Sequence, residues 1–297
     1  MFDQEWTGVP GQPLVTVAMP IYNAGKYLRL AVLSIVRQTF PDWELLIIDD
    51  GSTDSALQSI ADIGDERIRI LCDGKNKGLA ARLNECIDLA RGKYIARMDQ
   101  DDVSYPERFE QQIAALQKDS ELDLVATRAI TIDEGSRITG VFPSALRHDE
   151  ICARPWRGFH FPHPTWMGRT AWFRDHRYTE PAPYFCEDQE LLLRSYRQSC
   201  FVTLDEVLFA YRIRGETNWQ KLAKTRSAVL KIKMRQFVRL NQWDFALLAM
   251  AAYLAKIVSD LFTRVRRGTL NPGDDVGDAD VESKWHKVLE DLAAGET

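Results

Sequence analysis

Three carboxylates stand within four residues at Asp99-Gln100-Asp101-Asp102. Like charges this close repel one another unless a cation or strong hydration compensates for them. Hard divalent ions such as Mg²⁺ and Mn²⁺ prefer oxygen ligands, and proteins commonly hold them with one or two carboxylates together with substrate phosphates. The cluster therefore predicts a Mn²⁺ or Mg²⁺ site beneath a bound diphosphate. The alternative interpretation is a hydrated acidic turn that caps the next helix.

A second polar turn, Asp49-Asp50-Gly51-Ser52-Thr53-Asp54, follows the apolar run Glu44–Ile48. Gly51 permits a tight backbone at the point where this run ends. A carboxylate in the turn can accept a hydrogen bond from the imide N–H of uracil or from an equivalent base edge. The alternative is an ordinary strand-to-helix turn in which Ser52 or Thr53 caps the following helix.

Glu187 and Asp188 follow an aromatic segment and open a helical pattern that continues to Gln198. Transfer of a sugar to a hydroxyl requires a base that takes the proton of the acceptor as the new bond forms. A carboxylate at a helix N-terminus is well placed for this role, although the helix dipole is expected to keep its pKa low. The alternative is again a capping role.

Apolar runs alternate with helical patterns over the first hundred residues, which predicts βαβ units and a mostly parallel sheet. In such sheets, ligands bind outside the carboxyl ends of the strands. Pro20–Asn23, Asp49–Ser52 and Asp99–Asp102 follow three of the predicted strands, so we expect them to share one site. The predicted strands are Leu14–Met19, which Pro20 should end, Glu44–Ile48, Ile68–Cys72 and Tyr94–Met98.

The pattern Ser104-x-x-Glu107, with Pro106 in the first turn, predicts a capping box and a helix to about Lys118. Residues 120–215 mix short strands with aromatic and proline-rich loops. Four aromatic side chains in this region could form a stacking platform for a sugar or belong to the core, and we expect two of them in the core: Trp156, Phe159, Phe161 and Trp166.

The order of these signals resembles glycosyltransferase family 2. VTVAMPIYNAGKYLRLAVLSIVRQTFPDWELLIIDDGSTD is similar to the opening of that family, and KNKGLAARLNECIDLARGKYIARMDQDDVSYPERFEQQ to its middle. HPTWMGR and CEDQELLLR resemble its later landmarks, and the likeness covers roughly residues 14 to 214. The resemblance implies a GT-A fold: a Rossmann-like, mostly parallel α/β sheet flanked by helices. It also implies a nucleotide-diphosphate sugar as donor, UDP by default, and inversion at the anomeric carbon.

The resemblance also implies roles for residues that bind the nucleotide. Pro20 and Tyr22 would lie against the base, and Asp50 would bind its edge. Gly78 would let the backbone approach the nucleotide.

For the reacting groups, the resemblance implies that Asp99 faces the ribose and the sugar and that Asp101 coordinates the metal, with Asp99 beside it. Asp188 would be the general base, and Glu187 would orient it or the acceptor. The expected acceptor is a hydroxyl of a saccharide or of a lipid-linked molecule in cell-surface polysaccharide synthesis.

Two positions depart from the family pattern. Gln100 replaces a small residue, and Arg214 stands where a histidine is common. A guanidinium cannot ligate a cation, so metal contact at position 214 is not expected. Arg212 can still reach the diphosphate by charge-assisted hydrogen bonds. His163 precedes a proline and either touches a sugar or packs within its loop.

Other functions fit the sequence less well. A dehydrogenase would need G-x-G-x-x-G after the first strand, where Pro20-Ile-Tyr-Asn stands. A nucleotidyltransferase would need a basic, glycine-rich phosphate loop near the N-terminus. The alternative that we retain is a non-catalytic protein on the same fold that binds a nucleotide sugar or a saccharide.

The net charge of -5 conceals two opposite segments. From Trp219 to Arg267, eleven Lys and Arg stand against two Asp in helical patterns, whereas 268–297 is acidic with one short helical pattern. Basic amphipathic helices can lie on an anionic membrane, and the alternative is a packed pair with a hydrated basic face or a homodimer contact. Because the basic segment is local, we expect no nucleic-acid partner.

These observations divide the chain into an N-terminal tail (1–13), a catalytic domain (14–215), a basic helical extension (216–267) and an acidic C-terminal tail (268–297). Within the catalytic domain, 14–102 should bind the nucleotide and 103–215 the acceptor. The five scattered cysteines form no CxxC pair, and the N-terminus has no apolar signal segment. We therefore expect a cytoplasmic protein, either free or peripheral on the inner face of the cytoplasmic membrane.

Overall fold

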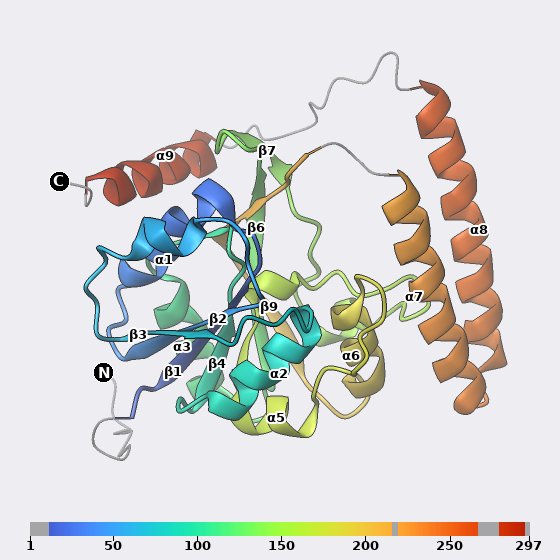
Figure 1. The fold of residues 1–297 in the computed structure, drawn as a ribbon. Helices are drawn as coiled ribbons and strands as arrows, with labels where there is room; N and C mark the ends of the chain where they lie inside the picture. Colours follow the sequence, from blue (N-terminus) through green and yellow to red (C-terminus); the bar gives the residue numbers. More distant parts are fainter. Residues whose placement is uncertain (1–11, 216–218, 267–278, 295–297) are drawn as a thin grey trace.

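The computed structural model describes residues 12–215, 219–266 and 279–294. Its centre is a single sheet whose first half consists of parallel strands in the spatial order β3, β2, β1, β4 (Figure 1). Every residue of β1, β2 and β4 is buried, as expected for parallel strands covered by helices on both faces. Their bounds are β1 Val15–Ile21, β2 Trp43–Asp49, β3 Ile68–Cys72 and β4 Tyr94–Arg97.

Helices α1 (Leu28–Val36) and α2 (Leu79–Leu89) cover opposite faces of these strands. Val17 of β1 belongs to the cluster that contains the buried side chains of α1, whereas Ala18 belongs to the cluster that contains those of α2. The alternation of side chains along a strand explains this division. The predicted strands and both predicted helices are thus present.

The second half of the sheet is mixed. β8 (Met167–Arg169) runs antiparallel to both β4 and β6 (Leu124–Ile132), whereas β6 and β9 (Phe201–Arg212) are parallel. β5 (Val103–Ser104) and β7 (Ile138–Val141) add antiparallel pairings with β9 and β6. The predicted α/β class is therefore confirmed, with the parallel pairing concentrated in the N-terminal half.

The prediction that Pro20 ends the first strand is wrong. β1 continues to Ile21, and Pro20 pairs with Ile48 of β2. The ladder between β1 and β4 already ends at the pair Ala18 and Arg97. The missing N–H of Pro20 faces that open side, so the proline costs no ladder hydrogen bond.

Two capping predictions are also wrong. Ser104 lies in β5, where its N–H donates to the Ser34 hydroxyl, and α3 (Arg108–Lys118) begins four residues later without a side-chain cap. Ser52 and Thr53 precede a 3-10 turn, η2 (Ala56–Ile60), whose N-cap residue makes no side-chain cap hydrogen bond. In both places the hydroxyl is positioned by tertiary contacts instead of by the helix that follows it.

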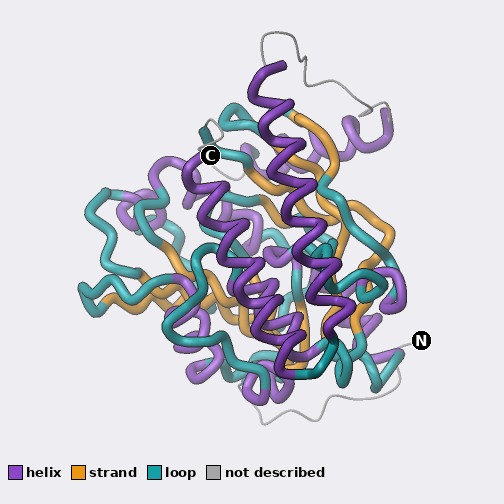
Figure 2. Tube along the Cα trace, turned by 90° about the vertical axis from the view of Figure 1, so that its right-hand side faces the viewer, coloured by secondary structure: helices purple, strands orange, loops and turns teal. Residues whose placement is uncertain are grey.

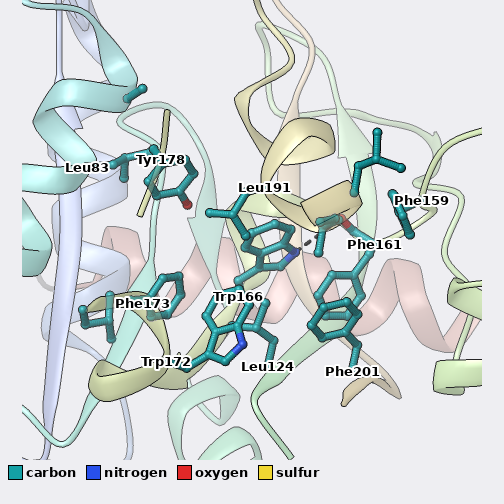
Figure 3. Packing of buried hydrophobic residues seen from close by; sticks show 14 of the residues in the cluster. Leu83, Leu124, Phe159, Phe161, Trp166, Trp172, Phe173, Tyr178, Leu191 and Phe201 are labelled. Carbon is teal, nitrogen blue, oxygen red and sulfur yellow. Dashed lines mark hydrogen bonds between the residues drawn. The ribbon is translucent and has the colours of Figure 1, made fainter. Parts of the chain in front are cut away.

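A core of aromatic side chains supports α6 (Glu187–Ser195). Trp166 is fully buried, and its indole N–H donates to the carbonyl oxygen of Phe161 at 3.3 Å (Figure 3). Leu191 of α6 packs in the same cluster. Phe159, Phe161 and Trp166 are all buried, one more than expected, and Trp156 is half-buried.

Two long helices, α7 (Trp219–Arg239) and α8 (Trp243–Arg266), form an antiparallel pair beside α6 (Figures 1 and 2). Phe237 of α7 is buried in the core, and the rings of Phe245 and Trp156 lie 5.0 Å apart. Both helices were predicted. Within the described residues, no helix combines the length and the apolar character needed to cross a membrane.

The C-terminal segment contains α9 (Ala279–Ala293), the one helix expected there, and this helix packs beside α1. Trp285 stacks on Tyr105 with ring centroids 6.0 Å apart, and its indole N–H donates to the carbonyl oxygen of Ser136 at 2.9 Å. The remaining short elements are η1 Gly25–Tyr27, α4 His148–Ile151, η3 His163–Thr165 and α5 Thr170–Asp175.

Candidate active site

The turns after β1, β2 and β4 meet at one edge of the sheet, as predicted from their positions. The side-chain amide of Gln100 accepts from Tyr22 N at 2.6 Å and donates to Tyr22 O at 3.0 Å. Asn23 donates its backbone N–H to the Ser52 hydroxyl at 3.0 Å, and its side-chain oxygen accepts from Thr53 N at 2.8 Å. Gln100, considered a mild departure at the level of sequence, therefore joins two of the three turns directly.

Asp50 is buried and fixes the loop that leads into α2. Its carboxylate accepts from Lys77 N at 2.6 Å, from Gly78 N at 3.0 Å and from Arg82 Nε at 2.9 Å. Gly78 has a φ of +87°, a conformation that side chains rarely adopt. The predicted nucleotide residues Asp50 and Gly78 are thus in direct contact, and part of the capacity of Asp50 to accept hydrogen bonds is already used.

Asp99 and Asp101 each face an arginine. Arg97 Nη1 lies 2.5 Å from Asp99 Oδ1, and Arg214 Nη1 lies 3.0 Å from Asp101 Oδ2. Both carboxylates keep partial exposure, at 27% and 17% of the side chain. Arg214, which departs from the family pattern, therefore pairs with the residue expected to bind the metal.

The neighbouring Asp102 is buried and closes the loop onto β9. Its Oδ1 accepts from Arg212 N at 2.8 Å, whereas its Oδ2 finds no hydrogen-bond partner in the described parts of the chain. The guanidinium of Arg212 donates to the carbonyl oxygens of Asp101 and Asp133 at 2.8 and 2.7 Å. A contact between Arg212 and a diphosphate would need some of these hydrogen bonds to be released.

The electrostatics of this loop suit a divalent cation. Burial and the charge of Asp99 raise the pKa of Asp101 despite its pair with Arg214. Burial and the charges of Asp99 and Asp101 raise the pKa of Asp102 well above its ordinary value. Among the described residues, no group of three or more His, Cys, Asp or Glu side chains could hold a metal ion. Asp99 and Asp101 could supply two oxygen ligands to a Mg²⁺ or Mn²⁺ ion, whose remaining ligands would come from phosphate and water.

Glu187 and Asp188 form the first turn of α6, as predicted. The amide of Gln189 donates to Asp188 Oδ2 at 3.1 Å and is itself bonded to the backbone of Phe159. Burial raises the pKa of Asp188, and burial together with the Asp188 charge raises the pKa of Glu187 to about 7. The low pKa expected from the helix dipole is therefore not found, because desolvation outweighs the dipole here.

Arg97, which none of the sequence motifs indicated, acts on all of these carboxylates except Asp101. This side chain is 3% exposed at the end of β4, and its positive charge acts on Asp99, Asp102, Glu187 and Asp188. Burial opposes the charge, yet Asp99 and its other acidic neighbours raise the pKa of Arg97 above the ordinary value. An arginine inside an otherwise apolar strand was the available signal, since charged groups are rarely buried unless paired.

His163 packs within its loop. It is buried, its Nε2 lies 2.7 Å from the Tyr178 hydroxyl, and its ring meets Trp166 edge-on at 4.5 Å. Burial, with the nearby Arg97 charge, lowers the pKa of His163 well below its ordinary value. These contacts favour the interpretation of His163 as a neutral, packed residue.

Comparison with known proteins adds independent information. Residues 16–177 match the family Glycosyl transferase family 2. EpsE of Bacillus subtilis is 39% identical over 166 residues, which cover 54% of this chain and 58% of EpsE. The chain thus matches less than two thirds of that relative's length.

Two solved structures share the fold, which confirms the GT-A architecture. TarS of S. aureus in complex with UDP-GlcNAc has a TM-score of 0.63 and 17% identity, over 94% of this chain and 80% of that one. The mannosyltransferase PcManGT of Pyrobaculum calidifontis in complex with GDP-Man and Mn²⁺ has a TM-score of 0.56 and 15% identity, over 98% and 90%.

The raised pKa of Glu187 predicts an unusual dependence of stability on pH. Between the ordinary pKa of 4.5 and about 7, the folded state binds more protons at this site than the unfolded state. Its contribution to the free energy of unfolding therefore falls as pH rises through that window. Glu187→Gln, which mimics the protonated form, should gain on the order of 2 kcal/mol relative to wild type between pH 5 and pH 8.

Urea unfolding of the metal-free protein at both pH values measures this difference. Glu121→Gln, at an exposed carboxylate, provides the matched control and should show no such gain. An equal free-energy difference between Glu187→Gln and wild type at pH 5 and pH 8 would contradict the electrostatic description of the site.

Proposed function

Because the chain belongs to glycosyl transferase family 2, we propose that it transfers a sugar from a nucleotide-diphosphate sugar, UDP by default, to a hydroxyl group. The acceptor is a saccharide or a lipid-linked molecule in polysaccharide synthesis. Transfer inverts the anomeric carbon. The family match covers the strand-end turns and the loop of Asp99 to Asp102, and it ends before Glu187 and Asp188.

The observation that carries this proposal is the family match over the three strand-end turns, which hydrogen bonds join at one edge of the sheet. The charge of Asp99, at the end of β4, contributes to raising the pKa of Glu187 at the start of α6. Arg97 acts on both the loop after β4 and the first turn of α6. Sugar transfer to a hydroxyl requires a site for the diphosphate close to a base, and we propose that the loop after β4 and the first turn of α6 supply these two parts.

Asp101 and Asp99 would hold the divalent ion. When bound, this ion neutralises negative charge on the departing diphosphate. The two carboxylates are partly exposed, so phosphate oxygens can complete the coordination. In the structure, Arg214 donates to Asp101. We propose that Arg214 turns toward the diphosphate when Asp101 binds the metal ion instead.

Asp188 is the proposed general base. The acceptor oxygen attacks the anomeric carbon as the bond to the diphosphate breaks, and Asp188 takes the hydroxyl proton. Inversion needs only this single displacement, so no covalent intermediate with the protein forms. Gln189 holds Asp188 through Oδ2 and leaves Oδ1 as the acceptor of the proton, while Glu187 orients the incoming hydroxyl.

The nucleotide would lie over the turns after β1 and β2. Tyr22 is 48% exposed and can stack on the base, with Pro20 beneath it. Asp50 would bind the edge of the base, and Gly78 would let the protein backbone approach the nucleotide. In support, the two structural neighbours described above were solved with UDP-GlcNAc and with GDP-Man and Mn²⁺.

We further propose that α8 rests on an anionic membrane, at the inner face of the cytoplasmic membrane. Four exposed apolar side chains share one face of α8 at helical spacing, and residues 245–255 contain no charge. Cations of the neighbouring α7 would attract anionic lipid. The four side chains are Trp243, Leu247, Leu254 and Val258, with exposures of 59%, 73%, 54% and 50%.

Replacing the proposed base gives the most direct test of the chemistry. Asp188→Asn should reduce sugar transfer by about 10²- to 10⁴-fold, because the amide cannot accept the proton. Binding of UDP in the presence of Mn²⁺, measured by calorimetry, should stay unchanged. Asp205→Asn, at an exposed position on β9, is the control and should retain activity. Full transfer activity of Asp188→Asn would refute the assignment of the base.

The membrane proposal is tested by pelleting with phosphatidylglycerol vesicles at low and at physiological salt. The double variant Leu247→Glu/Leu254→Glu should lose binding, since each glutamate places a charge in the apolar stripe. Leu71→Glu/Leu89→Glu, at exposed leucines elsewhere, should bind like wild type. The proposal is contradicted if wild type fails to pellet at both salt concentrations. If wild type is also dimeric by sedimentation and the α8 double variant is monomeric, the apolar stripe is a dimer contact instead.

A further inference from the structure

A hollow of about 320 Å³ lies between α6, α7 and the loop that precedes α6. Its lining includes Tyr184 of the loop, Arg194 of α6, and Lys231 and Arg235 of α7. A second hollow, which also contains Tyr184 and Lys231, continues it toward Lys224. We call this continuous depression the α7 groove.

The α7 groove has an excess of positive charge. Arg194 is paired with Glu190 at 2.7 Å, so the one carboxylate in the lining is already neutralised. Lys231 and Arg235 are exposed, and neither has a carboxylate within salt-bridge distance in the described part of the chain. Two unpaired cations beside a cavity fit a ligand that carries more than one negative charge.

The orientation of α7 is fixed, so these cations are held toward the groove. On the opposite side of the helix, Phe237 is buried in the core and Lys233 Nζ donates to the carbonyl oxygen of Trp156 at 3.0 Å. Arg226 pairs with Asp260 of α8. With α7 anchored on these sides, Lys231 and Arg235 are left on the side that faces the groove.

The groove also begins about one helical turn from Glu187, the neighbour of the proposed base. Glu190, which lines it, is three residues after Glu187, so the two lie about one turn, roughly 5 Å, apart along α6. The other wall is the loop from Thr179 to Tyr184, which ends just before Glu187. A ligand seated in the groove would therefore point one end at the first turn of α6.

We infer that the α7 groove binds the phosphate or diphosphate group of the acceptor, with Lys231 and Arg235 as its ligands. The inference rests on the proposed function in that the bound molecule is the acceptor of the sugar. The phosphate is held in the groove, and the hydroxyl of the attached sugar is directed to Glu187, the residue proposed to orient it. The enzyme thus selects anionic, phosphate-bearing acceptors over neutral saccharides.

Direct binding tests this inference without any transfer reaction. Calorimetric titrations use inorganic pyrophosphate and farnesyl diphosphate in EDTA, so that the metal-dependent donor site does not retain either probe. Wild type should bind, and Lys231→Ala/Arg235→Ala should weaken binding by about 100-fold, or about tenfold per charged contact. Arg239→Ala removes an exposed cation of α7 outside the groove and should bind like wild type.

The outcomes separate the sources of the phosphate and the rival uses of the cations. Binding of both probes supports a site for phosphate itself, and binding of farnesyl diphosphate alone supports a lipid-linked head group. Equal binding by wild type and the double variant, or no binding of either probe, overturns the inference. The inference is also overturned if the double variant no longer binds phosphatidylglycerol vesicles but binds both probes as tightly as wild type. A separate titration measures the binding of UDP in the presence of Mn²⁺. If UDP does not bind there, the result contradicts the proposed donor site and leaves the inference about the α7 groove unaffected.

Discussion

The arrangement of the site depends on Arg97, a buried positive charge that acts on two separate groups of carboxylates. Arg97 emerges from β4 into a region that contains Asp99, Asp102, Glu187 and Asp188, and it is the charge that acts on both acidic groups. A buried guanidinium is costly unless carboxylates surround it, and buried carboxylates are equally costly without it. Burial outweighs the attraction of Arg97, so the pKa values of Asp102, Glu187 and Asp188 are raised. A divalent ion bound at this edge would favour the ionised forms of the carboxylates next to it and would make a diphosphate tolerable there.

The sheet explains why these groups meet. Parallel strands deliver the turns after β1, β2 and β4 to one edge, and the amide of Gln100 links two of these turns through both of its polar atoms. β8 pairs antiparallel with β4, and α6 packs on an aromatic core that includes Trp166, the residue just before β8. Residues almost a hundred positions apart thus share one electrostatic environment without any direct bond between them.

Much of this arrangement could be predicted from the sequence, because it depends on patterns that are local. The spacing of apolar residues predicted the first four strands and the helices α1, α2 and α6. Because ligands bind at the carboxyl ends of parallel strands, the turns that follow these strands were expected to share one site. The identities of Asp50, Asp101 and Asp188 followed from chemistry and from the family resemblance. In the structure, Asp50 contacts Gly78, Asp101 pairs with Arg214 and Asp188 accepts from Gln189, and the roles of the three aspartates stay predictions.

What the sequence did not predict depends on tertiary contacts. The pattern at Ser104 predicted a helix cap. In the structure, Ser104 lies in β5 and donates its backbone N–H to the hydroxyl of Ser34 in α1. The pKa of Glu187 was expected to be low from the helix dipole, yet burial and Asp188 raise it. The importance of Arg97 is visible only once the acids around it are placed. In each case, a contact between residues distant in the sequence outweighed a local preference. Such contacts cannot be predicted from the spacing of residues along the chain.

The central claim is that this carboxylate edge accepts a divalent cation together with a nucleotide diphosphate. Anomalous diffraction from crystals soaked with Mn²⁺ and UDP measures this directly. The account predicts a manganese peak about 2–2.5 Å from a carboxylate oxygen of Asp101, bridged to the diphosphate, with Arg214 moved away from that carboxylate. A map with no manganese peak beside Asp99 or Asp101 while UDP is bound over Tyr22 would contradict it.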